Sequence, residues 1–259
     1  MSSAQWDRAA LVVAAGDELR RPEIVALGSE LPSVARLFTF MRDAELRFQS
    51  LRMRLEERSW TARGETVVVS EVVIQHAGRA RIATFEAGAG TAGNHVLWLT
   101  DGETVRTYVG ADRRGTERPI RNRPRGLDDR DFPGRSKVYT PLTPLQMETL
   151  PELFVHPAGF CQNVLATGHC RVSGTTDVAG RESIVLECDH PRTVEVLADR
   201  PDYRIEIAVD RLQGLITRLV ETVGSEITRM ATVVALDVDP PLAPDAFDFE
   251  FPAGTTIVY

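Results

Sequence analysis

Thiol and imidazole side chains gather in one short part of the sequence. All three cysteines and three of the five histidines fall within it: His156, Cys161, His169, Cys170, Cys188 and His190. Zinc prefers thiolate and imidazole ligands, and four of them in tetrahedral array would tie neighbouring segments together. The segment contains no Cys-x-x-Cys or His-x-x-x-His element, so we favour buried or inert thiols and keep zinc as an alternative. The alternative metal ligands are Cys161, His169, Cys170, Cys188 and His190.

Two further roles for the thiols stay open. In a reducing compartment no disulfide is expected, whereas in an exported protein a bond between Cys161 and Cys170 would be reasonable. Cys188 alternates with Ile184 and Leu186 on a predicted strand, which indicates a core position. Redox chemistry is therefore a lesser alternative to inert, buried thiols.

A glycine motif in the first half of the chain has to be weighed as a nucleotide site. Gly88, Gly90 and Gly93 reproduce the letters of the GxGxxG dinucleotide fingerprint. That fingerprint needs a helix after its last glycine, but the residues from Val96 to Leu99 read as a strand. We interpret the glycines as a hairpin loop. Since the chain also has no Gly-x-Ser-x-Gly or papain-like motif, we expect neither catalysis nor a cofactor.

Basic residues concentrate between Asp112 and Lys137, where nine basic and five acidic residues stand among prolines and glycines. This composition predicts a flexible, irregular loop over residues 111–140. A solvated loop is favoured, and the alternative is a grip on phosphate headgroups or on an acidic protein segment. The side chains for that role would be Arg113, Arg114, Arg118, Arg121, Arg123 and Arg125.

Composition places the chain among globular proteins. Of its 259 residues 43% are hydrophobic and 26% are charged, and the net charge of −7 disfavours nucleic-acid binding. No apolar run is long enough for a membrane span or a signal core, so we expect a cytoplasmic protein. Lys137 is the only lysine among 30 basic residues, a bias typical of a GC-rich, actinobacterial type of genome.

Hydrophobic periodicity predicts the elements that must position these residues. Residues 4–30 read as two short helices broken at Pro22, and a stronger helix is predicted over 32–47. Short helices are predicted over 144–150, 151–155 and 157–166, each starting at a proline. Strands are predicted from Leu51 and over 66–76, 79–87, 95–100, 104–110, 181–188, 203–210, 214–223 and 227–239.

The order of several degenerate motifs resembles the bacterial lipoprotein-carrier family, which includes LolA and the sigma-E regulator RseB. A strand with Arg79 and Arg81 precedes the Asp101-Gly102 hairpin and a strand with Tyr108, and the tail reads Phe247-Asp-Phe-Glu-Phe251-Pro. The resemblance implies an α+β fold. Its sheet would be a strongly curved, antiparallel, half-open β-barrel covered by helices and formed by residues 32–259. The N-terminal helical extension predicted over 1–31 lies outside the resemblance.

The resemblance also implies a non-catalytic role, in which a hydrophobic or lipid-like ligand lies between sheet and helices. The expected ligand-binding residues are Phe38, Met41, Leu51, Met53, Leu55, Phe85, Trp98, Tyr108, Phe160, Ile205 and Ile207, with Arg79 and Arg81 at the rim. Leu145 and Met147 would add to the helical cover. The alternative is a filled core in a regulatory module that docks a protein partner of the sigma or anti-sigma type.

Overall fold

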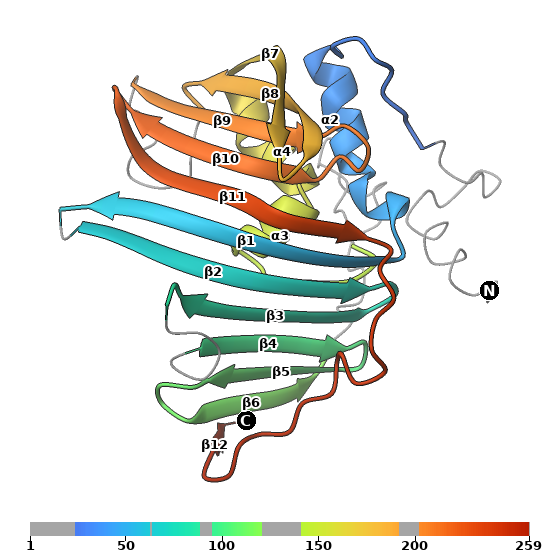
Figure 1. The fold of residues 1–259 in the computed structure, drawn as a ribbon, viewed down its shortest axis with the longest axis vertical. Helices are drawn as coiled ribbons and strands as arrows, with labels where there is room; N and C mark the ends of the chain where they lie inside the picture. Colours follow the sequence, from blue (N-terminus) through green and yellow to red (C-terminus); the bar gives the residue numbers. More distant parts are fainter. Residues whose placement is uncertain (1–23, 63, 89–94, 121–140, 192–201, 259) are drawn as a thin grey trace, which may run out of the picture.

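The computed structural model describes residues 24–62, 64–88, 95–120, 141–191 and 202–258. They form one large, curved, open sheet with a few short helices (Figure 1). The strands are β1 (Ser50–Thr61), β2 (Gly64–Gln75), β3 (Arg79–Glu86), β4 (His95–Asp101), β5 (Thr104–Val109), β6 (Arg114–Pro119), β7 (His169–Val178), β8 (Arg181–Asp189), β9 (Tyr203–Asp210), β10 (Ile216–Val223), β11 (Glu226–Val238) and β12 (Thr256–Val258). The predicted strands are all present, with ends that differ by one or two residues.

The sheet runs in the order β12-β6-β5-β4-β3-β2-β1-β11-β10-β9-β8-β7. Neighbouring strands pair antiparallel except β12, which pairs parallel with β6. One cross-strand row passes through Met53, Val72, Ile82, Trp98 and Thr107. Because side chains alternate along a strand, this row and those two residues away share one face. We call it the inner face, since the helices pack against it.

Helix α2 (Val34–Arg42) is followed by the 3-10 helix η1 (Ala44–Arg47), which together match the helix predicted over 32–47. Ser33 caps α2, because its side chain accepts a hydrogen bond from the Arg36 backbone nitrogen at 3.3 Å. Residues 24–31 before it contain no helix, and most of the helical extension predicted over 4–30 lies outside the described residues.

The second helical region is shorter than predicted. It consists of α3 (Leu150–Val155), α4 (Ala158–Asn163) and the 3-10 helix η2 (Leu165–Thr167). No helix forms over 144–149, so the prediction of a helix from Pro144 to Leu150 is wrong. Glu148 has a left-handed backbone with φ of 62°, and Thr149 acts as the N-cap of α3. A helix therefore cannot run through these two residues.

Three strands, β6, β7 and β12, were not predicted from the sequence. Strand β6 lies inside the predicted flexible loop and contains Arg114 and Arg118, while residues 121–140 of that loop lie outside the described part. Strand β7 ends the sheet and alternates polar and half-buried side chains without an apolar run. Edge positions tolerate such composition, so hydrophobic periodicity does not reveal them.

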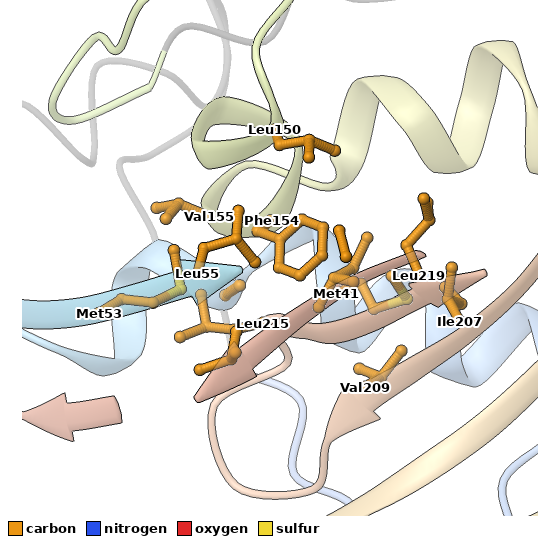
Figure 2. Packing of buried hydrophobic residues seen from close by; sticks show 14 of the residues in the cluster. Met41, Met53, Leu55, Leu150, Phe154, Val155, Ile207, Val209, Leu215 and Leu219 are labelled. Carbon is orange, nitrogen blue, oxygen red and sulfur yellow. The ribbon is translucent and has the colours of Figure 1, made fainter. Parts of the chain in front are cut away.

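A single large core fills the space between the inner face and the helices. Figure 2 shows Phe154 of α3 directed toward Leu55 of β1 and Leu215 beside β10, with Met41 of α2 close by. All four side chains are buried. Since each helix is too short to be stable alone, this packing is what holds them in place.

The opposite, outer face carries a smaller core beneath the C-terminal tail. Buried Leu97 and Tyr108 pack there with Phe249 and Phe251 of the tail. The rings of Tyr108 and Phe249 lie 5.9 Å apart, and those of Phe249 and Phe251 5.1 Å apart. The alternation of aromatic and acidic residues in the tail therefore directs every second side chain to the sheet.

Candidate functional site

The expected ligand-binding residues divide between the two faces of the sheet. Those on the inner side or its helices belong to or pack against the main core: Phe38, Met41, Leu51, Met53, Leu55, Trp98, Phe160, Ile205 and Ile207. On β3 and β5, the register places Arg79, Arg81, Phe85 and Tyr108 on the outer face. The two groups therefore lie on opposite faces of the sheet, and a site on the inner face would not include these four residues.

Three of the four outer-face residues have another contact. Arg79 lies over the Phe247 ring at 5.3 Å, and Arg54 lies over the Phe85 ring at 6.0 Å. Tyr108 packs in the smaller core. Arg79 therefore helps to hold the tail on the sheet and does not stand at the rim of an inner site.

Under the helices the inner face is filled with side chains. Met41, Leu51, Ile207 and Phe154 are all fully buried. They make the close-packed interior expected of a protein core. Of the two expected covering residues, Leu145 is buried in this core, whereas Met147 is 79% exposed and points away from it.

The described helices leave part of the inner face uncovered. In Figure 1 α4 lies behind the strands β7–β10, α2 lies beside the right-hand ends of these strands and α3 lies near β11 and β1, whereas none of the described helices lies over β4–β6. On these strands the inner face carries Thr100 of β4 and Arg114, Thr116 and Arg118 of β6. Between them it carries five further residues: Val96, Trp98, Val105, Thr107 and Val109. Val96 is 40% exposed and Val105, Thr107 and Val109 are half-buried, while Trp98 is buried.

We call these five residues the inner-face patch. Hydroxyl groups in and next to the patch are paired across strands. Thr107 Oγ1 lies 2.7 Å from Thr116 Oγ1, and next to the patch Ser70 Oγ lies 3.0 Å from Thr84 Oγ1. Since a hydroxyl has one donor and two acceptor positions, each pair retains capacity for a further polar group. The surface is thus mostly apolar, with these hydroxyl groups and with Arg114 and Arg118 of β6 beside Val109 and Val105. Apolar side chains with a few polar groups are the usual make-up of a ligand site.

The patch was missed in the sequence, apart from Trp98. Its signal was present in the alternation of Val96 with Trp98 and of Val105 with Thr107 and Val109. Alternation defines which residues share a face, but it does not show which part of that face the helices leave uncovered.

A buried polar cluster lies beside the main core. His156 Nε2 donates to the Thr143 carbonyl at 3.0 Å, and His76 Nδ1 lies 2.8 Å from Thr143 Oγ1. The Glu45 carboxylate accepts from the Leu142 backbone nitrogen at 2.8 Å and lies 3.6 Å from His156 Nδ1. The cluster thereby ties residues 142–143 and α3 to η1 and to the end of β2.

Burial controls the protonation of this cluster. Desolvation raises the pKa of Glu45 to about 8, against the opposing hydrogen bond from Leu142. It lowers the pKa of His76 and that of His156 to about 4. Near neutral pH the carboxyl group is therefore mostly protonated and both imidazoles are neutral, so the cluster carries little charge.

The three thiols come together near η2, whereas His156 does not join them. Cys161 Sγ lies 3.7 Å from Met41 Sδ, and Cys170 and Cys188 Sγ contact the Leu165 carbonyl. His156 is bound to Thr143 instead. Within the described ranges, no group of three or more histidine, cysteine or acidic residues could hold a metal ion. The zinc alternative thus has no site in that part of the chain.

Two other predicted features have limited structural counterparts. Of the GxGxxG letters only Gly88 is described, and Gly90 and Gly93 lie outside the described residues. Residues 27–33 and Arg36 line a surface hollow of about 420 Å³ before α2, away from the patch. No described helix has the length and apolar character needed to cross a membrane.

The fold is that of a large, curved, open antiparallel sheet with short helices on one face. Solved structures similar to it include MucB, with a TM-score of 0.49 and 15% identity over 84% of this chain and 62% of that one. An uncharacterized conserved protein from Thermus thermophilus has a TM-score of 0.48 and 11% identity over 86% of this chain and 98% of that one. A LolA superfamily protein from Nitrosomonas europaea has a TM-score of 0.34 and 9% identity over 85% of this chain and 99% of that one.

The chain therefore spans less than two thirds of the MucB chain. No protein-family model matches the sequence, and no curated protein does.

Proposed function

We propose that the protein binds a hydrophobic or lipid-like molecule, as a carrier or sensor, on the inner-face patch. The supporting observation is the exposure of Val96 together with half-buried Val105 and Val109 on the part of the inner face that the described helices leave uncovered. An acyl chain lying along these strands would remove their side chains from water. Each Å² of apolar area buried in this way contributes about 25 cal/mol to binding.

The buried core beside the patch supports this role. Trp98 belongs to that core while its strand neighbour Val96 is exposed, so the patch begins where the packed core ends. A rigid, packed border limits the entropy lost when a ligand binds. The threonine hydroxyl pair at Thr107 and Thr116 supplies the polar contact for a headgroup or a carboxylate.

The first test is native mass spectrometry of the full chain, purified from its own host and compared with the denatured chain. An added mass of lipid size, lost on denaturation, is the expected result. Titration with a fluorescently labelled fatty acid, followed by anisotropy, then gives an affinity. A bare chain that also fails to bind this probe would overturn the proposal.

Val96→Asp tests whether the ligand binds on the inner-face patch. We expect it to weaken fatty-acid binding by about tenfold or more, because tenfold corresponds to about 1.4 kcal/mol and an unpaired carboxylate against an acyl chain costs more. Val234→Asp is the matched control, since Val234 is also an exposed strand valine, at 46%, but lies on β11 outside the patch. Equal affinities for the two variants would place the ligand elsewhere.

A second candidate function is a regulatory module that binds a protein partner. Strand β7 ends the sheet in the described part of the chain, and its residues alternate between exposed and half-buried. Such an edge offers unpaired backbone groups to which a partner can add a strand. Mass spectrometry separates the two functions, since this one needs no bound lipid and co-purifies a polypeptide instead.

A further inference from the structure

We propose that Cys170 and Cys188 form a redox-active dithiol, which a small-molecule disulfide converts into a cross-strand disulfide bond. The two residues lie directly opposite each other on antiparallel strands β7 and β8. Opposite residues in such a pair have Cα atoms about 4.5–5.5 Å apart, and disulfides span about 4.4–6.8 Å. The backbone therefore needs no rearrangement to form the bond.

The side chains already converge. Cys170 Sγ lies 3.1 Å and Cys188 Sγ 3.3 Å from the same oxygen, the carbonyl of Leu165. That oxygen also accepts from the Gly168 backbone nitrogen at 3.0 Å. A carbonyl has two lone pairs, so three donors cannot all be satisfied there. One thiol hydrogen is left to the other sulfur, in agreement with a hydrogen bond between the two thiols.

The two thiols differ in access and acidity. Cys170 is half-buried on the edge strand, while Cys188 is buried. The hydrogen bond from Cys188 lowers the pKa of Cys170, and the same bond together with burial raises the pKa of Cys188. Cys170 is thus the accessible thiolate that attacks first, since the thiolate is the reactive form.

Cys161 is the unreactive member of the group. Burial raises the pKa of its thiol to about 12, and its sulfur packs on Met41 Sδ at 3.7 Å. The sequence made a disulfide between Cys161 and Cys170 reasonable for an exported protein, but the strand pairing favours Cys170 with Cys188.

The reaction balances with a low-molecular-weight disulfide as oxidant. The Cys170 thiolate attacks one sulfur of the oxidant, forms a mixed disulfide and releases one small thiolate, which takes up a proton. Cys188 then attacks the Cys170 sulfur, which breaks the mixed disulfide and releases the second small thiol. Two protein thiols become one disulfide, and one oxidant disulfide is reduced to two thiols.

Oxidation changes the attachment of the helical cover. In the reduced protein both thiols contact the Leu165 carbonyl of η2, which follows α4. The disulfide has no S–H group, so this carbonyl keeps only the Gly168 donor. At the same time the bond closes the open end of the β7–β8 hairpin at the sheet edge. The inference concerns thiol chemistry and does not depend on the proposed ligand.

The test uses the full chain, reduced, freed of reductant and incubated with graded ratios of oxidised to reduced glutathione. Quenching with iodoacetamide, followed by intact mass and peptide mapping, reports the state of each thiol. Alkylated after denaturation, the oxidised form should carry two alkylated thiols fewer than the reduced form. We also expect a peptide pair joined through Cys170 and Cys188 and a higher midpoint of urea unfolding for the oxidised form. Cys161 should become alkylated only after denaturation.

Cysteine variants test which thiols take part in the reaction. Cys161→Ser should oxidise as the parent chain does, whereas Cys188→Ala should stop at a mixed disulfide with glutathione on Cys170. A bond that includes Cys161 would overturn the proposal. Two thiols that stay free in the parent chain under oxidised glutathione alone would also overturn it, and this mapping needs no variant to fold.

Discussion

At the residue scale, the buried pair Glu45 and His156 makes the stability of the protein depend on pH. The carboxyl group and the imidazole Nδ1 lie 3.6 Å apart with almost no solvent contact. His156 Nε2 donates to the Thr143 carbonyl, so Nδ1 carries no proton in the neutral ring. Such a site couples the packing of α3 against η1 to protonation, because charging either member inside the protein is costly.

The pKa shifts predict a stability maximum near pH 6.5. The lowered pKa values of His76 and His156, about 4, mean that stability is lost as the pH falls from 6.5 toward 4. The raised pKa of Glu45, about 8, means that stability is lost as the pH rises from about 4.5 to 8. Two histidines outweigh one glutamate below pH 6.5, and above it the glutamate acts alone. Urea unfolding across this range measures the curve.

Glu45→Gln tests how much ionisation of the Glu45 carboxyl group contributes to the dependence of stability on pH. Its amide oxygen still accepts from the Leu142 nitrogen, but the side chain cannot ionise. We expect the variant to gain stability relative to the parent chain as pH rises from 4.5 to 8, by at most about 1.4 kcal/mol per pH unit. A stability difference that does not change with pH would show that Glu45 is not protonated when folded.

At the element scale, helices α2 and α3 depend on their N-caps and on contacts with the inner face. Helices α2 and α3 have 9 and 6 residues and are too short to be stable alone. Ser33 and Thr149 are their N-caps. The stability of the cover is therefore decided by a few side chains.

Phe154→Ala should destabilise the protein by about 3–5 kcal/mol, because it empties a fully buried aromatic site between α3 and the sheet. Met147→Ala, close in sequence but 79% exposed, is the control and should change the free energy of unfolding by less than about 0.5 kcal/mol. Similar effects for the two variants would mean that α3 does not pack as described.

Ser33→Ala removes the α2 cap and should cost about 1 kcal/mol of unfolding free energy. Ser33→Asp keeps an acceptor for the Arg36 nitrogen and should recover most of this loss. Circular dichroism with urea unfolding measures both variants, and a loss that Asp does not recover would argue against the cap.

At the scale of the whole molecule, the C-terminal tail links the middle of the sheet to one of its edges. It leaves β11 next to β1, crosses the outer face and ends as β12 beside β6, as the red trace in Figure 1 shows. The Asp239 carboxylate accepts from the Gln49 and Ser50 nitrogens at 2.6 and 3.0 Å, so the start of the tail is tied to β1.

Gly115→Ala tests the tail contact. An added Cβ would lie 2.3 Å from the Phe251 ring, so the ring must move off the sheet. We expect a loss of about 1–3 kcal/mol and faster proteolysis near residue 251. Gly174→Ala is the matched control, since a Cβ there, also in a strand, has open space around it. Equal proteolysis of the two variants would contradict the contact.

The sequence by itself determined nine of the twelve described strands and the helix before β1, because apolar periodicity is a local property of the chain. The curved, open sheet was expected from the resemblance in motif order and not from periodicity. Leu51, Met53 and Leu55 alternate whatever lies opposite them. The edge strand β7 was not predicted, because an edge strand need not contain an apolar run. The helix predicted over 144–150 failed because Glu148 adopts a left-handed backbone.

Tertiary structure alone decided which face each side chain occupies. Arg81 and Ile82 are neighbours in sequence, yet their strand places one on the outer face and the other in the main core. Likewise, only the pairing of β7 with β8 brings Cys170 to Cys188, 18 residues away in sequence. Register and coverage by helices depend on contacts between distant segments, and no local pattern contains that information.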